Sequence, residues 1–148
     1  MSVSKTILLV EDNASDADLT RRALFKGHIS NELMVVEDGQ EALDYLRAEG
    51  AFAGRNIAET PALILLDLKL PKVPGLEVLR LIRADPRIRR VPVVILTSSK
   101  EEVDIGAGYD LGVNSYVRKP VDFKEFQIAI ENLGLYWLLL NEPHPPIR

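Results

Sequence analysis

The chain has 148 residues, which is enough for one domain with a buried core. Hydrophobic residues make up 47% of it and charged residues 27%, and 22 acidic against 18 basic side chains give a net charge of −4. With no basic excess we expect no nucleic-acid partner, and the lack of cysteine excludes a disulfide framework and thiolate chemistry. The apolar runs near both ends are too short for a signal peptide or a membrane span, so we expect a cytoplasmic protein with no membrane partner.

Short runs rich in leucine and β-branched residues alternate with stretches of helical spacing along the chain. The runs predict strands, in chain order, at residues 6–10, 33–36, 63–66, 91–96 and 116–117. Between and after them, apolar residues recur in steps of three and four. Strands that alternate with helices predict an α/β fold, a doubly wound (βα)5 domain with a parallel sheet.

Polar side chains stand where the predicted strands end. Glu11 and Asp12 follow the first strand, and Asp67 follows the third. Thr97 follows the fourth strand, and Lys119 follows the fifth. In an open α/β sheet, ligands bind beyond the carboxyl ends of the strands. If the first and third strands are neighbours, the three carboxylates therefore converge in one pocket.

These residue types together predict a phosphoryl-transfer site. Three close carboxylates repel one another unless positive charge compensates them. Lys119 can supply one such charge, and Mg²⁺, which prefers oxygen ligands, can supply the rest. No cysteine or histidine stands at a strand end, which argues against zinc or iron. With the Thr97 hydroxyl as a hydrogen-bond donor, Asp67 would be the attacking oxygen and would form an aspartyl phosphate.

Each of these residues also has a simpler structural explanation. Asp67 could cap the segment that follows it, and residues 97–99 could be the N-cap region of the next helix. Lys119, before Pro120, could be a solvated loop residue. Because four strand ends agree on one chemistry, we favour the phosphoryl-transfer interpretation.

The chain resembles the receiver domain of two-component response regulators over about residues 5–140. Four stretches carry the resemblance: "ILLVEDN" (7–13), "LILLDLKLPKVPG" (63–75), "VPVVILTSS" (91–99) and "NSYVRKPVDF" (114–123). The resemblance implies a flavodoxin-like sheet of five strands in the order 2-1-3-4-5. We expect residues 1–148 to form a single receiver domain, with a core at about 5–140, a C-terminal tail at 141–148 and no output domain.

The resemblance also implies the roles of the acidic residues. A partner histidine kinase would donate the phosphoryl group to Asp67. Glu11, Asp12 and Asp67 would bind Mg²⁺, with the backbone carbonyl of Lys69 as a further ligand. The family commonly has a smaller or neutral residue at position 69, so the lysine leaves the rate of self-hydrolysis open.

The same resemblance implies a conformational switch. Thr97 would match the switch hydroxyl and Tyr116 the switch aromatic, and Lys119–Pro120 would be a cis peptide. The family commonly has Asp or Asn at position 74, where this chain has Pro74, which offers the fixed φ of a helix start.

The stretch "AEGAFAGRNIAETP" (48–61) and the tail "GLYWLLLNEPHP" (134–145) narrow the resemblance. Both look like stand-alone regulators that are paired with bacterial phytochrome histidine kinases. The last predicted helix carries two apolar stripes, and one helix face packs on its own sheet while the other needs a cover. We expect a homodimer through the fifth strand, the fifth helix and the tail. The expected interface residues are Phe126, Ile130, Leu133 and Trp137. A kinase-docking face, or a tail that folds back on its own domain, remain alternatives.

We therefore expect a phosphoacceptor signalling protein that is not an enzyme beyond its own phosphorylation and dephosphorylation. A Mg²⁺-dependent phosphohydrolase would have a second Asp where Lys69 stands, and a nucleotide- or flavin-binding domain would have a glycine-rich turn after the first strand. A receiver that works without phosphate, as an interaction module, is the remaining alternative. The glycines at 106 and 108 either reflect surface tolerance or keep the fourth helix close to a second arrangement.

Overall fold

The computed structural model describes residues 6–26, 32–98, 102–119 and 122–137. Its first half contains β1 (Ile7–Val10), α1 (Ala14–Lys26), β2 (Leu33–Val36), α2 (Gly39–Arg47) and the 3-10 turn η1 (Gly50–Phe52). Its second half contains β3 (Leu63–Leu66), α3 (Gly75–Ala84), β4 (Val93–Thr97), α4 (Glu102–Asp110), β5 (Ser115–Arg118) and α5 (Phe123–Leu135).

The five strands form one parallel sheet in the order β2-β1-β3-β4-β5. This confirms the predicted fold and strand order. The fourth strand begins at Val93 rather than at residue 91, because Pro92 has no N–H to donate to the ladder. It ends at Thr97, one residue later than the predicted end at residue 96.

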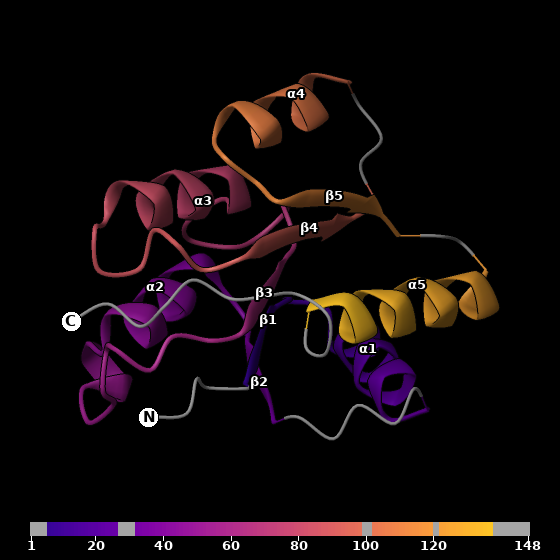
Figure 1. The fold of residues 1–148 in the computed structure, drawn as a ribbon, viewed down its shortest axis with the longest axis horizontal. Coiled ribbons are helices and arrows are strands. Elements are labelled where there is room, and N and C mark those ends of the chain that lie inside the picture. Colours follow the sequence, from indigo (N-terminus) through magenta and orange to yellow (C-terminus); the bar gives the residue numbers. More distant parts are fainter. Residues whose placement is uncertain (1–5, 27–31, 99–101, 120–121, 138–148) are drawn as a thin grey trace.

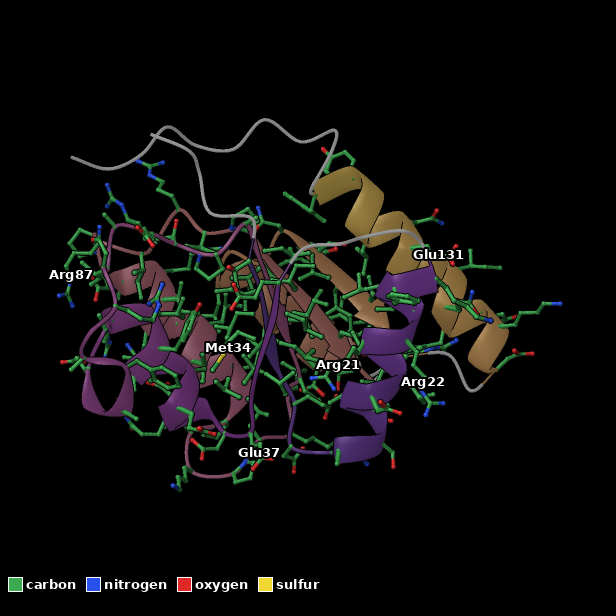
Figure 2. The ribbon with its side chains drawn as sticks, turned by 90° about the horizontal axis from the view of Figure 1, so that it is seen from below. Arg21, Arg22, Met34, Glu37, Arg87 and Glu131 are labelled. Carbon is green, nitrogen blue, oxygen red and sulfur yellow. The ribbon has the colours of Figure 1, made fainter. Side chains whose placement is uncertain are left out.

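Helices cover both faces of the sheet (Figure 1). Helices α1 and α5 pack together on one face, whereas α2 and α3 pack together on the other. Side chains of β1 point alternately to the two faces of the sheet. Ile7 packs toward α1 and α5, and Leu8 packs toward α2 and α3. Figure 2 shows the same division, with Met34 on the α2 and α3 side and Glu131 on α5.

The long segment after α2 is packed against that helix. The ring of Phe52 meets the ring of Tyr45 edge-on, with 5.2 Å between the centroids. The guanidinium of Arg55 lies 3.8 Å from the centroid of the Tyr45 ring and donates to the carbonyl oxygens of Tyr45 and Glu59. These contacts tie the stretch at 48–61 to the domain.

Two of the four residues that we expected at an interface lie in the core of the chain itself. Phe126 is 5% exposed and Ile130 is fully buried, and both pack with α1 against the sheet. Leu133 and Trp137 are partly buried at the margin of the same core. The apolar stripe of α5 that we assigned to a partner is thus covered largely by α1. The tail at 141–148 lies outside the described residues.

None of the helices in the described part of the chain is both long and apolar enough to cross a membrane.

The start of α3 approaches the backbone around Asp67 closely. A Cβ atom on Gly75 would lie 2.2 Å from the carbonyl oxygen of Asp67 and 2.7 Å from the Cα of Leu68. The N–H of Gly75 donates to the carbonyl of Leu68 at 3.0 Å. Pro74 is the N-cap residue and not the first helical residue, and it makes no side-chain cap. The contact at Gly75 therefore positions the loop that carries Asp67.

We predict that Gly75→Ala lowers the free energy of unfolding by about 1–3 kcal/mol, because the new methyl group must displace backbone atoms. Chemical denaturation measures the change. The matched control is Gly54→Ala, where a Cβ would have no neighbour within 4 Å, and which should change stability by less than about 0.5 kcal/mol. Equal effects of the two substitutions would contradict the close approach.

Candidate functional site

The parallel pairing of β1 and β3 brings the first acidic residues together. Val10 pairs with Leu66 at the ends of these strands, so the next residues, Glu11 and Asp67, leave the sheet side by side. The N–H of Asp67 donates to the carbonyl of Val10 at 3.1 Å, and the N–H of Glu11 donates to the carbonyl of Val36 at 3.0 Å. Backbone hydrogen bonds thus hold both residues at the carboxyl edge of the sheet.

Three carboxylates gather at this edge, in agreement with the prediction from the strand ends. Glu11, Asp12 and Asp67 each place one oxygen so that all three oxygens lie within 4.8 Å of one another. Glu11 is buried, Asp67 is partly buried and Asp12 is exposed. This set of oxygen donors, open to solvent on the side of Asp12, suits a hard divalent cation that keeps several waters.

The ammonium of Lys119 lies among the carboxylates. Its Nζ donates to Glu11 Oε1 at 2.5 Å, to Asp67 Oδ2 at 3.0 Å and to Asp16 Oδ2 at 2.9 Å. Its backbone N–H donates to the carbonyl of Thr97 at 2.6 Å, which fixes the end of β5 against β4. The three N–H donors of the ammonium therefore each have an acceptor. The predicted cis peptide involves Pro120, which lies outside the described residues.

Burial and Lys119 act differently on the buried carboxyl group of Glu11 and the partly buried carboxyl group of Asp67. Burial raises the pKa of Glu11 from 4.5 to about 7, although Lys119 opposes the rise. Burial also pushes the pKa of Asp67 upward, but the charge and hydrogen bond of Lys119 and the N–H of Lys69 outweigh burial and hold that pKa below its ordinary value. Burial works against the charge of Lys119, yet its hydrogen bonds to Glu11 and Asp16 raise its pKa overall. At neutral pH the site therefore contains an ionised Asp67 and a charged lysine.

The second oxygen of Asp67 faces the loop after β3. The backbone N–H of Lys69 donates to Asp67 Oδ1 at 3.2 Å, while the Lys69 residue is exposed. The loop thus orients the carboxylate from one side and Lys119 orients it from the other. Ligation of a metal by the carbonyl of Lys69 remains a prediction.

The two expected switch residues occupy different levels of the sheet. Thr97 is fully buried at the end of β4, at the same edge as Asp67. Tyr116 pairs with Ile95 two residues earlier and packs, partly buried, against the core on the α2 and α3 side. A Cβ on Gly108 would lie 3.0 Å from Ile95 Cδ1 and 3.5 Å from the Tyr116 ring, so α4 comes close to both side chains. A Cβ on Gly106, in contrast, would meet no neighbouring atom within 4 Å.

Sequence reasoning missed one member of the site, Asp16. It lies in the first turn of α1, where its carboxylate binds Lys119. The signal was present in the pattern, because the first helix begins at the carboxyl end of the first strand. Its opening turn must therefore lie at the same edge of the sheet as Glu11 and Asp12.

The chain matches the response regulator receiver domain family over residues 7–131. Rcp1 from Synechocystis sp. is 40% identical over 134 residues, which cover 90% of this chain and 89% of Rcp1. The structure of the Mn²⁺-bound form of Rcp1 has a TM-score of 0.87 to this chain at 38% identity, covering 95% of this chain and 99% of that one.

Two further solved structures are similar over nearly the whole chain. The phosphorylated cyanobacterial phytochrome response regulator RcpA has a TM-score of 0.88 at 41% identity, covering 95% of this chain and 99% of that one. The bacteriophytochrome response regulator RtBRR has a TM-score of 0.77 at 56% identity, covering 97% of this chain and 86% of that one. The chain thus belongs to the receiver-domain family of two-component response regulators, and its relatives include phytochrome response regulators.

Proposed function

We propose that this chain is a phosphoacceptor that receives a phosphoryl group from a histidine kinase on Asp67, in a reaction that depends on Mg²⁺. The observation that carries the proposal is the contact of one largely buried lysine with an ionised aspartate inside a cluster of three carboxylates. The phosphorylated relative RcpA supports it. The chain would then act in the cytoplasm through protein contacts, and its only chemistry would be its own phosphorylation and dephosphorylation.

The side chains of the site are suited to this transfer. An ionised oxygen of Asp67 attacks the phosphorus, an O–P bond forms, and the N–P bond to the kinase histidine breaks with its electron pair on the leaving imidazole. Lys119 lies 3.0 Å from Asp67 and places a fixed positive charge beside the transferring oxygens. The buried hydroxyl of Thr97 would donate a hydrogen bond to one of them.

The donor set fits a magnesium ion. Glu11, Asp12 and Asp67 would hold it, with the carbonyl of Lys69 as the fourth ligand from the chain. When bound, the ion neutralises negative charge on the transferring phosphoryl group. The Mn²⁺-bound form of the relative Rcp1 supports a divalent cation in this family.

The kinase that we propose as partner is a bacterial phytochrome. The names of RcpA and RtBRR connect those two proteins with phytochromes, and both cover at least 95% of this chain. The packed stretch at 48–61 and the apolar end of α5 are the features of this chain that favour this group of regulators.

We predict that the protein gains one phosphoryl group when it is incubated with acetyl phosphate and Mg²⁺. Intact mass spectrometry measures the adduct. The gain should be lost without Mg²⁺ and in Asp67→Asn, which removes the nucleophilic oxygen. Asp38→Asn, a carboxylate change at the N-cap of α2, is the control that should keep the adduct. An adduct on Asp67→Asn, or none on the wild type together with no beryllofluoride binding, would refute the acceptor role.

We predict that Mg²⁺ binds more tightly as the pH rises from 6 to 8. Because burial raises the pKa of Glu11 to about 7, metal binding must release a proton below that pH. The Mg²⁺ affinity should fall by at most about tenfold between pH 7 and pH 6, because each bound ion releases no more than one proton from Glu11. Calorimetric titration measures it, and Glu11→Gln should flatten the dependence.

The same raised pKa of Glu11 also determines how the stability of the metal-free protein changes with pH. The protonated Glu11 stabilises the folded state fully below pH 4.5, and this contribution is lost as the pH rises through about 7. The stabilisation that Mg²⁺ provides should therefore grow over that range. A stabilisation that is largest at pH 5 would contradict the assignment.

We also propose that the chain forms a homodimer through β5 and α5. Strand β5 is an edge of the described sheet, and a surface pocket of about 540 Å³ lies between it and α5. The residues that line this pocket are Asn114, Ser115, Val117, Ala129, Asn132, Leu133, Tyr136 and Trp137. A second copy would cover this partly apolar surface. Phe126 and Ile130 are buried in the core of their own chain. Of the four expected interface residues, the proposed dimer interface therefore keeps Leu133 and Trp137, together with their neighbours.

We predict that Trp137→Glu yields monomers in sedimentation velocity, because a carboxylate would be buried at the interface without a partner. Phe25→Glu is the control, since Phe25 is 81% exposed on α1 and should leave the dimer intact. Circular dichroism verifies that the variant is folded, because Trp137 also packs on its own core. A Trp137→Glu protein that is folded and still dimeric would exclude this interface.

A further inference from the structure

Lys119 binds one carboxylate that does not belong to the proposed metal site. Glu11 and Asp67 are members of the cluster whose oxygens could share an ion, together with Asp12. Asp16 is not a member of that cluster, which was identified among the described residues. Its Oδ2 nevertheless lies 2.9 Å from the Nζ of Lys119. The lysine therefore has two partners that a cation would also use, and one partner of its own.

The backbone of Asp16 is held in place by its neighbours. Its N–H donates to Asn13 Oδ1 at 3.0 Å, which caps the start of α1. Its carbonyl accepts from Thr20 Oγ1 at 2.9 Å. An acidic side chain in the first turn also interacts favourably with the positive end of the helix dipole. These contacts fix the backbone of Asp16 at the start of α1, from which its carboxylate reaches Lys119.

We propose that Asp16 is a positioning residue that holds the ammonium of Lys119 and so leaves Glu11 and Asp67 available to a divalent cation. This inference rests on the proposed phosphoacceptor function, in which that cation takes part. Lys119 donates to all three carboxylates in the structure, and its charge is compensated by all of them. Without Asp16, the charge of the lysine has only the two metal-binding partners, and the lysine competes with the cation for their lone pairs.

A double-mutant cycle on the full chain tests this role. The Mg²⁺ affinity is measured by calorimetric titration for the wild type, Asp16→Asn, Lys119→Gln and the double variant. Asp16→Asn should weaken Mg²⁺ binding about fivefold in the wild-type background, within the range of couplings measured between contacting residues. In the Lys119→Gln background the same substitution should have little effect, because no lysine competes with the ion.

The matched control separates this contact from a change in net charge. Asp18→Asn removes the same charge from the same helix, where Asp18 pairs with Arg22 at the surface at 3.0 Å. It should change Mg²⁺ affinity less than Asp16→Asn and equally in both backgrounds. Asp16→Glu, which keeps a carboxylate, should recover part of the affinity.

Two results would overturn the role of Asp16. One is an effect of Asp16→Asn that equals that of Asp18→Asn, and the other is an effect that persists unchanged without Lys119. Phosphorylation of the wild type is measured separately. A wild type that takes no phosphoryl group and binds no beryllofluoride refutes the proposed function, while the Mg²⁺ cycle still decides whether Asp16 acts on the lysine.

Discussion

One largely buried ammonium group organises the carboxyl edge of this sheet. The side chain of Lys119 is 11% exposed, and moving such a charge out of water is unfavourable unless its partners satisfy it. Three carboxylates from two different parts of the chain do so, and without the lysine those same carboxylates would repel one another. The charges at this edge are therefore mutually dependent, and removal of the lysine would leave the carboxylates uncompensated.

The order of the strands explains why a lysine can hold this position. Strand β5 is not a neighbour of β1 or β3, because β4 lies between them. The side chain that starts at the end of β5 must therefore cross the end of β4, to which the Lys119 N–H is bound at Thr97. A long and flexible side chain with a compact charge can reach across a strand in this way. All four residues of β1 and all four of β3 are apolar and buried, so the polar residues next to these strands stand at the strand ends.

Much of this arrangement was predictable from the sequence because it depends on local signals. Continuous apolar runs identified the buried strands, and the polar residue after each run identified the site. The sequence did not predict which element packs against each face of a helix. Phe126 and Ile130 were therefore assigned to a partner chain, although α1 of the same chain covers them. Long-range hydrogen bonds were equally hidden, such as that between the guanidinium of Arg83 and the side chain of Asn114 at 2.9 Å. Periodicity shows which residues need a cover, and only the packing shows which element provides it.

The proposed signal needs a route from Asp67 to the surface, and the packing around β4 and β5 provides the elements of one. Thr97 and Ile95 lie on the same strand, and Ile95 is the register partner of Tyr116. Helix α4 approaches Ile95 and Tyr116 through Gly108, so the Tyr116 ring lies directly beside this helix. A larger residue at 108 would separate the helix from the ring and weaken the link. If Thr97 and Tyr116 act as the switch pair, the glycine at 108 has a specific purpose, which is to keep α4 close enough to respond.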